Sequence, residues 1–120
     1  MDPPRPPTPP TIERRRDPRA RASFPLVFTP PSGPVEASVR DVSQSGICAA
    51  AARPIPEMTR VRFRFDLPTG EGSRRVEGEG AVVRCVRRGE GGYEVAIFFT
   101  EVSEADRERI AGFVRTSNRL

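Results

Sequence analysis

The stretch TRVRFRFDL, residues 59–67, alternates between polar and apolar side chains from Arg60 to Leu67. Its apolar positions are Val61, Phe63, Phe65 and Leu67, and its polar positions are Arg60, Arg62, Arg64 and Asp66. Successive side chains of a β-strand point to opposite faces, so this pattern predicts a strand with one buried and one solvated face. The chain is therefore expected to build a sheet with a core on one side.

The segments around this strand repeat the pattern at short intervals. Further strands are predicted at 23–29, at 35–42, from Ile47, at 74–88 and at 93–100, with turns rich in Gly and Pro between them. Pro25 lacks a backbone donor, so the strand at 23–29 is expected at a sheet edge. Gly78 and Gly80 suit a bulge or a sharp curvature. Six short antiparallel strands favour a small closed or half-closed barrel.

The last segment changes to a helical period. Residues 103–106, SEAD, resemble a capping box, and Ile110, Phe113 and Val114 follow at helical spacing. We expect one helix at 103–117 that packs its apolar stripe on the sheet. Other core candidates are Val61, Phe63, Phe65, Phe98 and Phe99, with Cys48 and Cys85 in or near the core.

The composition argues against catalysis. The chain has 120 residues, 36% of them apolar, which is enough for one ordinary domain. All 20 of its Lys and Arg residues are Arg, and there is no His. The usual general base, the commonest zinc ligand and any Schiff-base Lys are thus missing. The two Cys form no CxxC pair. We therefore expect no enzyme activity, no catalytic residue, no metal and no cofactor.

The N-terminal region predicts an appendage rather than part of the core. Residues 1–12 contain six Pro, which remove backbone donors, so this stretch is expected to be a disordered, extended tail. Residues 13–21 form an Arg-rich arm. No secretory signal and no apolar run long enough to span a bilayer is found, so we expect a cytoplasmic protein without a membrane partner.

The positive charge is concentrated in this arm. Residues 1–21 hold six Arg against three acids, whereas the remaining residues hold 14 Arg against 13 acids. A nucleic-acid-binding barrel usually spreads its cations over a strand face, with exposed aromatic side chains between them. Nucleic acid is therefore not an expected partner.

Two short motifs could carry a binding function. In the first, three adjacent arginines, residues 14–16, precede Arg19, and their guanidinium forks suit phosphates and the O6/N7 edge of guanine. In the second, D-x-S-x-x-G at 41–46, a carboxylate and a hydroxyl can meet a guanine. Taken alone, the first motif is better explained as a nonspecific basic tail, and the second as a turn that joins two strands.

Together, the two motifs resemble the signature of the PilZ domain family. The order is R-x-x-x-R at Arg15–Arg19 and then D-x-S-x-x-G at Asp41–Gly46. The resemblance extends through residues 78–114 and covers roughly 13–117. It implies a mainly β fold, a six-stranded antiparallel barrel at 22–100 with one C-terminal α-helix at 103–117.

The resemblance also implies a ligand, the bacterial second messenger cyclic di-GMP. Carried over by residue, the ligand-binding positions would be Arg14, Arg15 and Arg19 on the arm, and Asp41, Ser43 and Gly46 at the turn. Gly46 would let the backbone come close to the ligand. Binding would reorder the arm and so signal to a downstream protein partner, which the sequence does not identify.

Two other functions remain open at this point. A barrel of the same fold could act as a ligand-independent adaptor through protein–protein contact. A small basic barrel for RNA or single-stranded DNA is a weaker alternative, because the barrel itself is nearly neutral.

Overall fold

A computed structural model describes residues 17–118 of the chain. The alternating stretch forms the strand β5, Arg60–Thr69, in which every second residue from Val61 to Leu67 is buried and the arginines between them are exposed. The predicted strand and its two faces are confirmed. The buried face contributes two phenylalanines to the core.

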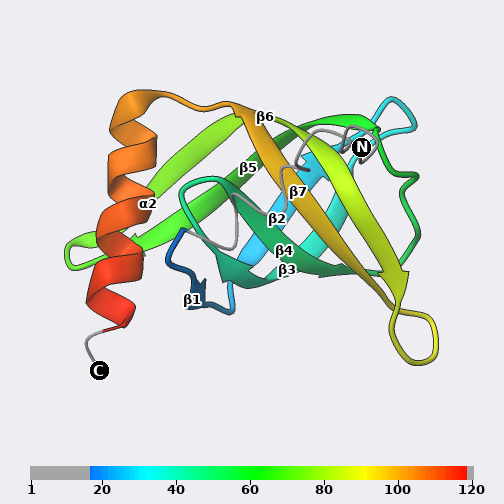
Figure 1. Cartoon of the computed structure of the whole chain (residues 1–120), viewed down its shortest axis with the longest axis horizontal. Helices are drawn as coiled ribbons and strands as arrows, with labels where there is room; N and C mark the ends of the chain where they lie inside the picture. The colour runs from blue at the N-terminus through cyan, green and yellow to red at the C-terminus, as the bar shows by residue number, and fades with distance from the viewer. Residues whose placement is uncertain (1–16, 119–120) are drawn as a thin grey trace, which may run out of the picture.

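The other strands complete a closed antiparallel barrel (Figure 1). They are β1 (Ala20–Arg21), β2 (Pro25–Thr29), β3 (Val35–Val42), β4 (Gly46–Ala51), β6 (Gly72–Arg87) and β7 (Tyr93–Glu101). Their order is β1-β3-β2-β5-β6-β7-β4, and a further pairing of β3 with β4 closes the ring. The six strands β2 to β7 thus form the predicted barrel. The two-residue strand β1 is an addition to it.

The prediction that the strand with Pro25 lies at an edge is wrong. β2 lies inside the sheet and pairs with both β3 and β5. Pro25 is the first residue of β2 and is paired only with Ser38 of β3, while the pairing with β5 begins at Leu26. The missing donor of Pro25 therefore interrupts no hydrogen bond between β2 and β5. The first residue of a strand is a position at which proline is tolerated.

Phenylalanine rings fill much of the barrel interior. Phe63 stacks on Phe65 and on Phe99, with ring centroids 5.9 and 4.8 Å apart. Phe24 stacks on Phe65 at 5.4 Å. Of the expected core residues, Phe98 is only half-buried, because it points to the opposite face of β7 from Phe99. Cys48 is buried and Cys85 is half-buried, in or near the core as predicted.

The long strand β6 bends where the sequence has glycines. Its register with β7 shifts between Glu79 and Gly80, as the glycines at 78 and 80 led us to expect. A side chain at Gly78 would collide with the backbone of β7, so the two strands approach each other closely there.

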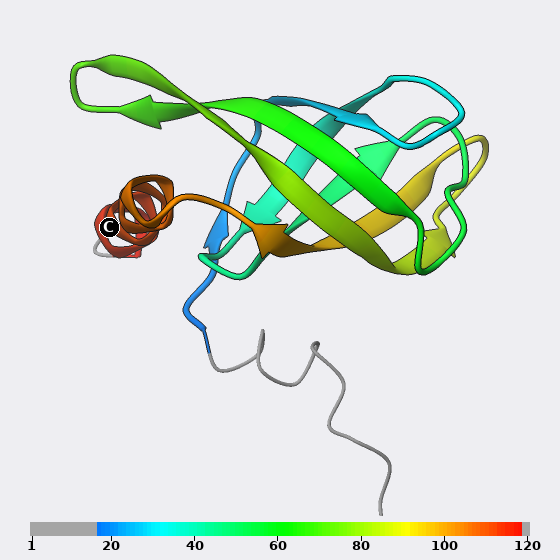
Figure 2. The same cartoon turned by 90° about the horizontal axis from the view of Figure 1, so that it is seen from above.

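The helix α2, Glu104–Ser117, closes one end of the barrel (Figure 2). Ser103 caps it by accepting a hydrogen bond from the backbone N–H of Asp106, at 3.1 Å, as the capping pattern predicted. Ile110 and Val114 are buried against the barrel, and Phe113 is half-buried and packs edge-on to Phe24. No helix of residues 17–118 has the length and the apolar character that crossing a bilayer requires.

Candidate functional site

Strand pairing brings the arm to the turn at 41–46. β1 pairs with the end of β3, where Ala20 lies opposite Val42 and Arg21 opposite Asp41. Both β1 and β2 lie on the same side of β3, because β4 occupies the other side. Arg19 directly precedes β1, and its side chain reaches Asp41. The other predicted arm residues, Arg14 and Arg15, are outside the described residues.

Arg19 and Asp41 form an ion pair across this junction. The Nε atom of Arg19 donates to Oδ1 of Asp41 at 2.8 Å, and its Nη2 atom donates to the same oxygen. The two side chains remain 27% and 32% exposed, so each is still open to a ligand from solvent. One residue from each sequence motif is therefore part of a single contact, although 22 positions separate them.

Ser43 lies at the same turn but is fully buried. Its hydroxyl accepts a hydrogen bond from the backbone N–H of Ser45 at 3.2 Å and donates to the carbonyl of Gly46 at 3.4 Å. Its own N–H donates to the Gly46 carbonyl at 2.9 Å. Ser43 thus shapes the turn, and the direct contact with a guanine that we expected from the sequence is not available to it in this conformation.

Gly46 begins β4 and pairs with Phe98 of β7. It is buried, so its backbone is not exposed to solvent. The carbonyl of Ser45 accepts from the N–H of Phe99 at 2.9 Å, which fastens the turn to β7. The turn is consequently a fixed platform beside Arg19.

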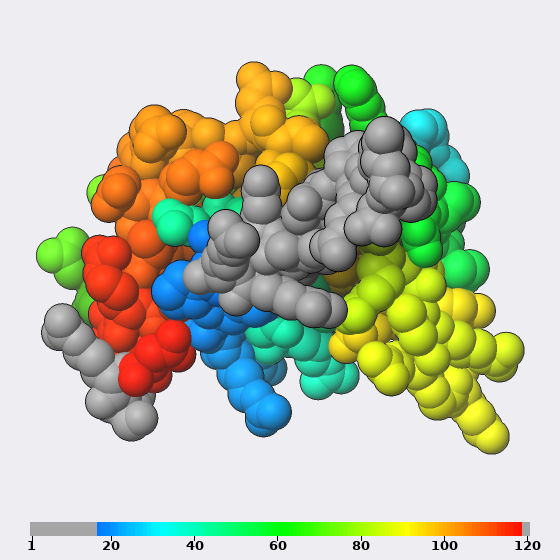
Figure 3. Space-filling view, viewed as in Figure 1, coloured from blue at the N-terminus to red at the C-terminus, as the bar shows by residue number. Residues whose placement is uncertain are grey.

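Two residues that the sequence did not single out connect α2 to this site. Nη1 of Arg107 donates to the carbonyl of Gln44 at 2.7 Å, and Nδ2 of Asn118 donates to the carbonyl of Arg19 at 3.1 Å. In the space-filling view, the described part of the arm lies against the end of α2 (Figure 3). No sequence signal marks these two residues, because their partners lie 63 and 99 positions away.

Comparison with known proteins identifies the family. A family model described as "PilZ domain" matches residues 13–116. The chain belongs to the PilZ domain family. No curated protein matches it in sequence.

Solved structures share the fold of this PilZ domain. The Bacillus subtilis inhibitor of motility, MotI/DgrA, aligns with a TM-score of 0.80 and 18% identity over 88% of this chain. The alignment covers 52% of MotI/DgrA, so this chain spans about half the length of that protein. The PilZ domain of YcgR from Escherichia coli, solved with c-di-GMP, aligns with a TM-score of 0.63 and 18% identity, over 88% of this chain and 92% of that domain.

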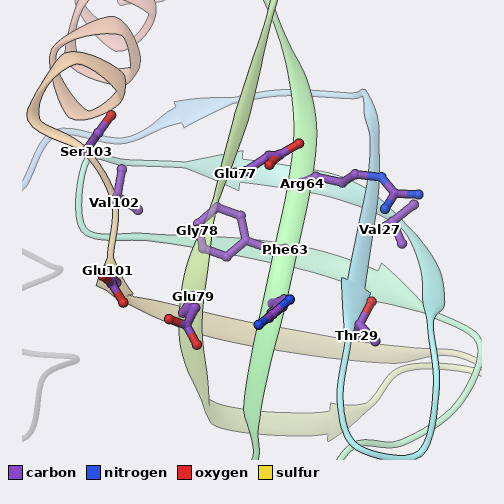
Figure 4. Close-up of a pocket in the computed structure, with 11 residues that line it drawn as sticks. Val27, Thr29, Phe63, Arg64, Glu77, Gly78, Glu79, Glu101, Val102 and Ser103 are labelled. Carbon is purple, nitrogen blue, oxygen red and sulfur yellow. The ribbon is translucent and has the colours of Figure 1, made fainter.

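A separate groove lies on the outside of this PilZ domain, and none of the arm or turn residues lines it (Figure 4). It has a volume of about 640 Å³, and its walls come from β2, β5, β6, the last residue of β7 and the linker between β7 and α2. The charged side chains along it are Arg62, Arg64, Glu77, Glu79 and Glu101. The groove thus presents both positive and negative charges. The contact between Arg19 and Asp41 lies elsewhere.

Two carboxylates of this groove repel each other. Glu79 of β6 and Glu101 of β7 are direct cross-strand partners. A hydrogen bond with Glu79, together with the charge of that residue, raises the pKa of Glu101 above its ordinary value of 4.5. Between pH 4.5 and this raised pKa, the folded protein holds a proton that the unfolded chain has released, so this contribution to stability is lost as the pH rises through the raised pKa.

Replacing Glu79 by Gln is expected to raise the melting temperature at neutral pH. The amide removes the repulsion and can still form the hydrogen bond to Glu101. The gain should shrink as the pH falls, because protonation of Glu101 then relieves the repulsion in the wild type as well. Thermal melts across this pH range measure it, with Glu90→Gln in an exposed loop as the control. A gain in melting temperature that does not depend on pH would contradict the raised pKa of Glu101.

Proposed function

We propose that this PilZ domain is a receptor for cyclic di-GMP. The ligand would bind between the arm, with Arg14, Arg15 and Arg19, and the turn at 41–46. The observation that carries this proposal is the contact of Arg19 with Asp41, which unites the two motifs at one partly exposed site. The c-di-GMP complex of the YcgR PilZ domain, which shares the fold, supports it.

The chemistry of the contact residues matches the ligand. Cyclic di-GMP carries two phosphates and two guanines. Arginine binds phosphate oxygens or the O6/N7 edge of guanine with two parallel hydrogen bonds. Asp41 uses only Oδ1 for Arg19, so Oδ2 remains to accept from the N1–H and the amino group of a guanine. Ser43 and Gly46 contribute by fixing the turn beside Asp41.

The domain would act without catalysis. The signal would pass to a protein partner when the arm rearranges, since ligand binding stabilises the arrangement that it contacts best. A ligand-independent adaptor is the function that remains if no ligand binds.

Calorimetric titration of the protein with cyclic di-GMP, cyclic di-AMP and GMP tests this function. We expect saturable binding of cyclic di-GMP and an affinity for cyclic di-AMP lower by about 10-fold to 100-fold. Adenine has no N1–H and no 2-amino group, so Asp41 would be left without its donors. GMP should also bind more weakly, because it offers half of the contacts.

Absence of binding by the folded protein would overturn the receptor proposal and favour the adaptor. Equal affinity for the two cyclic dinucleotides would show that Asp41 does not read guanine. Binding of RNA or single-stranded DNA with a strong salt dependence would instead favour the nucleic-acid alternative.

A further inference from the structure

The helix α2 is bonded to both halves of the proposed ligand site. Arg107, in its first half, reaches the carbonyl of Gln44 at the turn, at 2.7 Å. Asn118, just beyond its last turn, reaches the carbonyl of Arg19 on the arm, at 3.1 Å. The two donors are about 16 Å apart along the helix axis, at about 1.5 Å per residue. One helix thus connects the two segments of the proposed site.

The bond from Asn118 fixes the backbone just before the short strand β1. β1 has only two residues, and Arg19 lies just before it. The side chain of Arg19 is held by Asp41, while its backbone is held by Asn118. Without the Asn118 amide, the arm is anchored by β1, by the buried side chain of Ala20 and by the partly exposed ion pair. Exposed ion pairs of this kind stabilise a structure by about 1 kcal/mol or less.

The bond from Arg107 completes the fixation of the turn. The backbone of Ser43 and the carbonyl of Ser45 are already bonded within the turn and to β7. The carbonyl of Gln44, between them, receives its bond from Arg107. A guanidinium that donates to a carbonyl forms a charge-assisted bond, which is stronger than a neutral one. The platform next to Asp41 therefore depends on the position of α2.

The position of α2 is in turn fixed by the core. Ile110 and Val114 are at most 2% exposed, and Phe113 packs on Phe24 with ring centroids 6.2 Å apart. Phe24 follows the arm directly, between β1 and β2. The helix thus holds the arm through side-chain packing as well as through Asn118. Arm, turn and helix form one connected unit.

We propose that Arg107 and Asn118 are positioning residues of the ligand site, and that ligand binding is coupled to the last turn of α2. The inference rests on the proposed function. Both residues preorganise the site, so their loss weakens binding although neither contacts the ligand. Because coupling between two sites is reciprocal, the ligand stabilises the end of α2 in return. The end of the helix is then where a partner protein can sense the bound state.

The positioning role is tested by calorimetric titration of Arg107→Ala and Asn118→Ala with cyclic di-GMP. We expect the dissociation constant to rise about tenfold for Arg107→Ala and about fivefold for Asn118→Ala, which corresponds to one lost hydrogen bond each. The matched controls are Arg115→Ala and Thr116→Ala, which remove an exposed cation and an exposed hydroxyl from the same helix. Both controls should bind like the wild type. Arg107→Lys, which keeps a cationic donor, should recover part of the affinity.

The coupling to the last turn of α2 is tested by hydrogen exchange of the backbone amides at 114–118. In the wild type, cyclic di-GMP should slow this exchange, whereas in Asn118→Ala the slowing should largely disappear. A merely structural role of Asn118 would change the exchange rate but not its response to the ligand. If a variant does not fold, the wild type alone still tests the coupling. A wild type in which cyclic di-GMP does not slow exchange at 114–118 overturns it.

The outcomes separate the two proposals. A wild type that does not bind cyclic di-GMP overturns the proposed function and this inference together. If the wild type binds cyclic di-GMP, and Arg107→Ala and Asn118→Ala bind it with the same affinity as the wild type, only the inference is overturned.

Discussion

Replacing Arg15 and Arg19 together by alanine is expected to weaken cyclic di-GMP binding at least about 100-fold. Each guanidinium supplies charge-assisted hydrogen bonds, which stabilise a complex by about 1.5–3 kcal/mol, and two such losses add to about 3–6 kcal/mol. At about 1.4 kcal/mol for each factor of ten, the lower end of this range already gives about 100-fold. Calorimetric titration of the double variant against the wild type measures the change.

A matched control separates this loss from a general loss of positive charge. Arg62→Ala with Arg64→Ala also removes two cations, from exposed positions that line the groove on β5. We expect this control to bind almost normally. If the control loses affinity and the arm variant keeps it, the ligand binds in the groove, and the site at Arg19 and Asp41 is wrong.

Replacing Gly78 by alanine is expected to destabilise the barrel by about 2–3 kcal/mol. The new Cβ atom would lie 2.3 Å from the backbone carbonyl oxygen of Glu101 and 2.8 Å from Cζ of Phe63. The carbonyl belongs to a paired strand, and the ring stacks on Phe99 at 4.8 Å, so neither can move aside without loss of contacts. For a domain of about 100 residues, this corresponds to a fall in Tm on the order of 10 °C.

Gly70→Ala is the control for this prediction. Gly70 lies at the tip of the hairpin between β5 and β6, and no atom lies within 4 Å of an added Cβ. Thermal melts should place this variant within about 0.5 kcal/mol of the wild type, as for most surface substitutions. Equal Tm values for both variants would show that β6 does not approach β7 as closely as described.

The barrel could be predicted from sequence because its signals are local. The alternation at 59–67 marks both faces of β5, and the pattern at 103–106 marks the start of α2. The glycines at 78 and 80 marked the bend in β6. The edge position of the strand with Pro25 was wrong, because the missing donor stands at the strand's first residue and leaves the β5 ladder intact.

The site could be predicted only in part, because its contacts join distant segments. The two motifs pointed to Arg19 and Asp41, and the structure brings these together. Ser43 was expected at the ligand, but its hydroxyl is buried within the turn, a distinction that depends on packing and not on residue type. Arg107 and Asn118 gave no signal, since a polar residue on an amphipathic helix resembles any solvated position.

The site itself is tested most directly by backbone amide chemical shifts, measured as cyclic di-GMP is added. The proposed site predicts that the shifts change at 19–22, at 41–46 and at the end of α2. It also predicts that the amides around Arg62, Arg64, Glu77 and Glu79 in the outer groove keep their shifts. Changes confined to the groove, or no change in a folded protein at saturating ligand, would contradict the account.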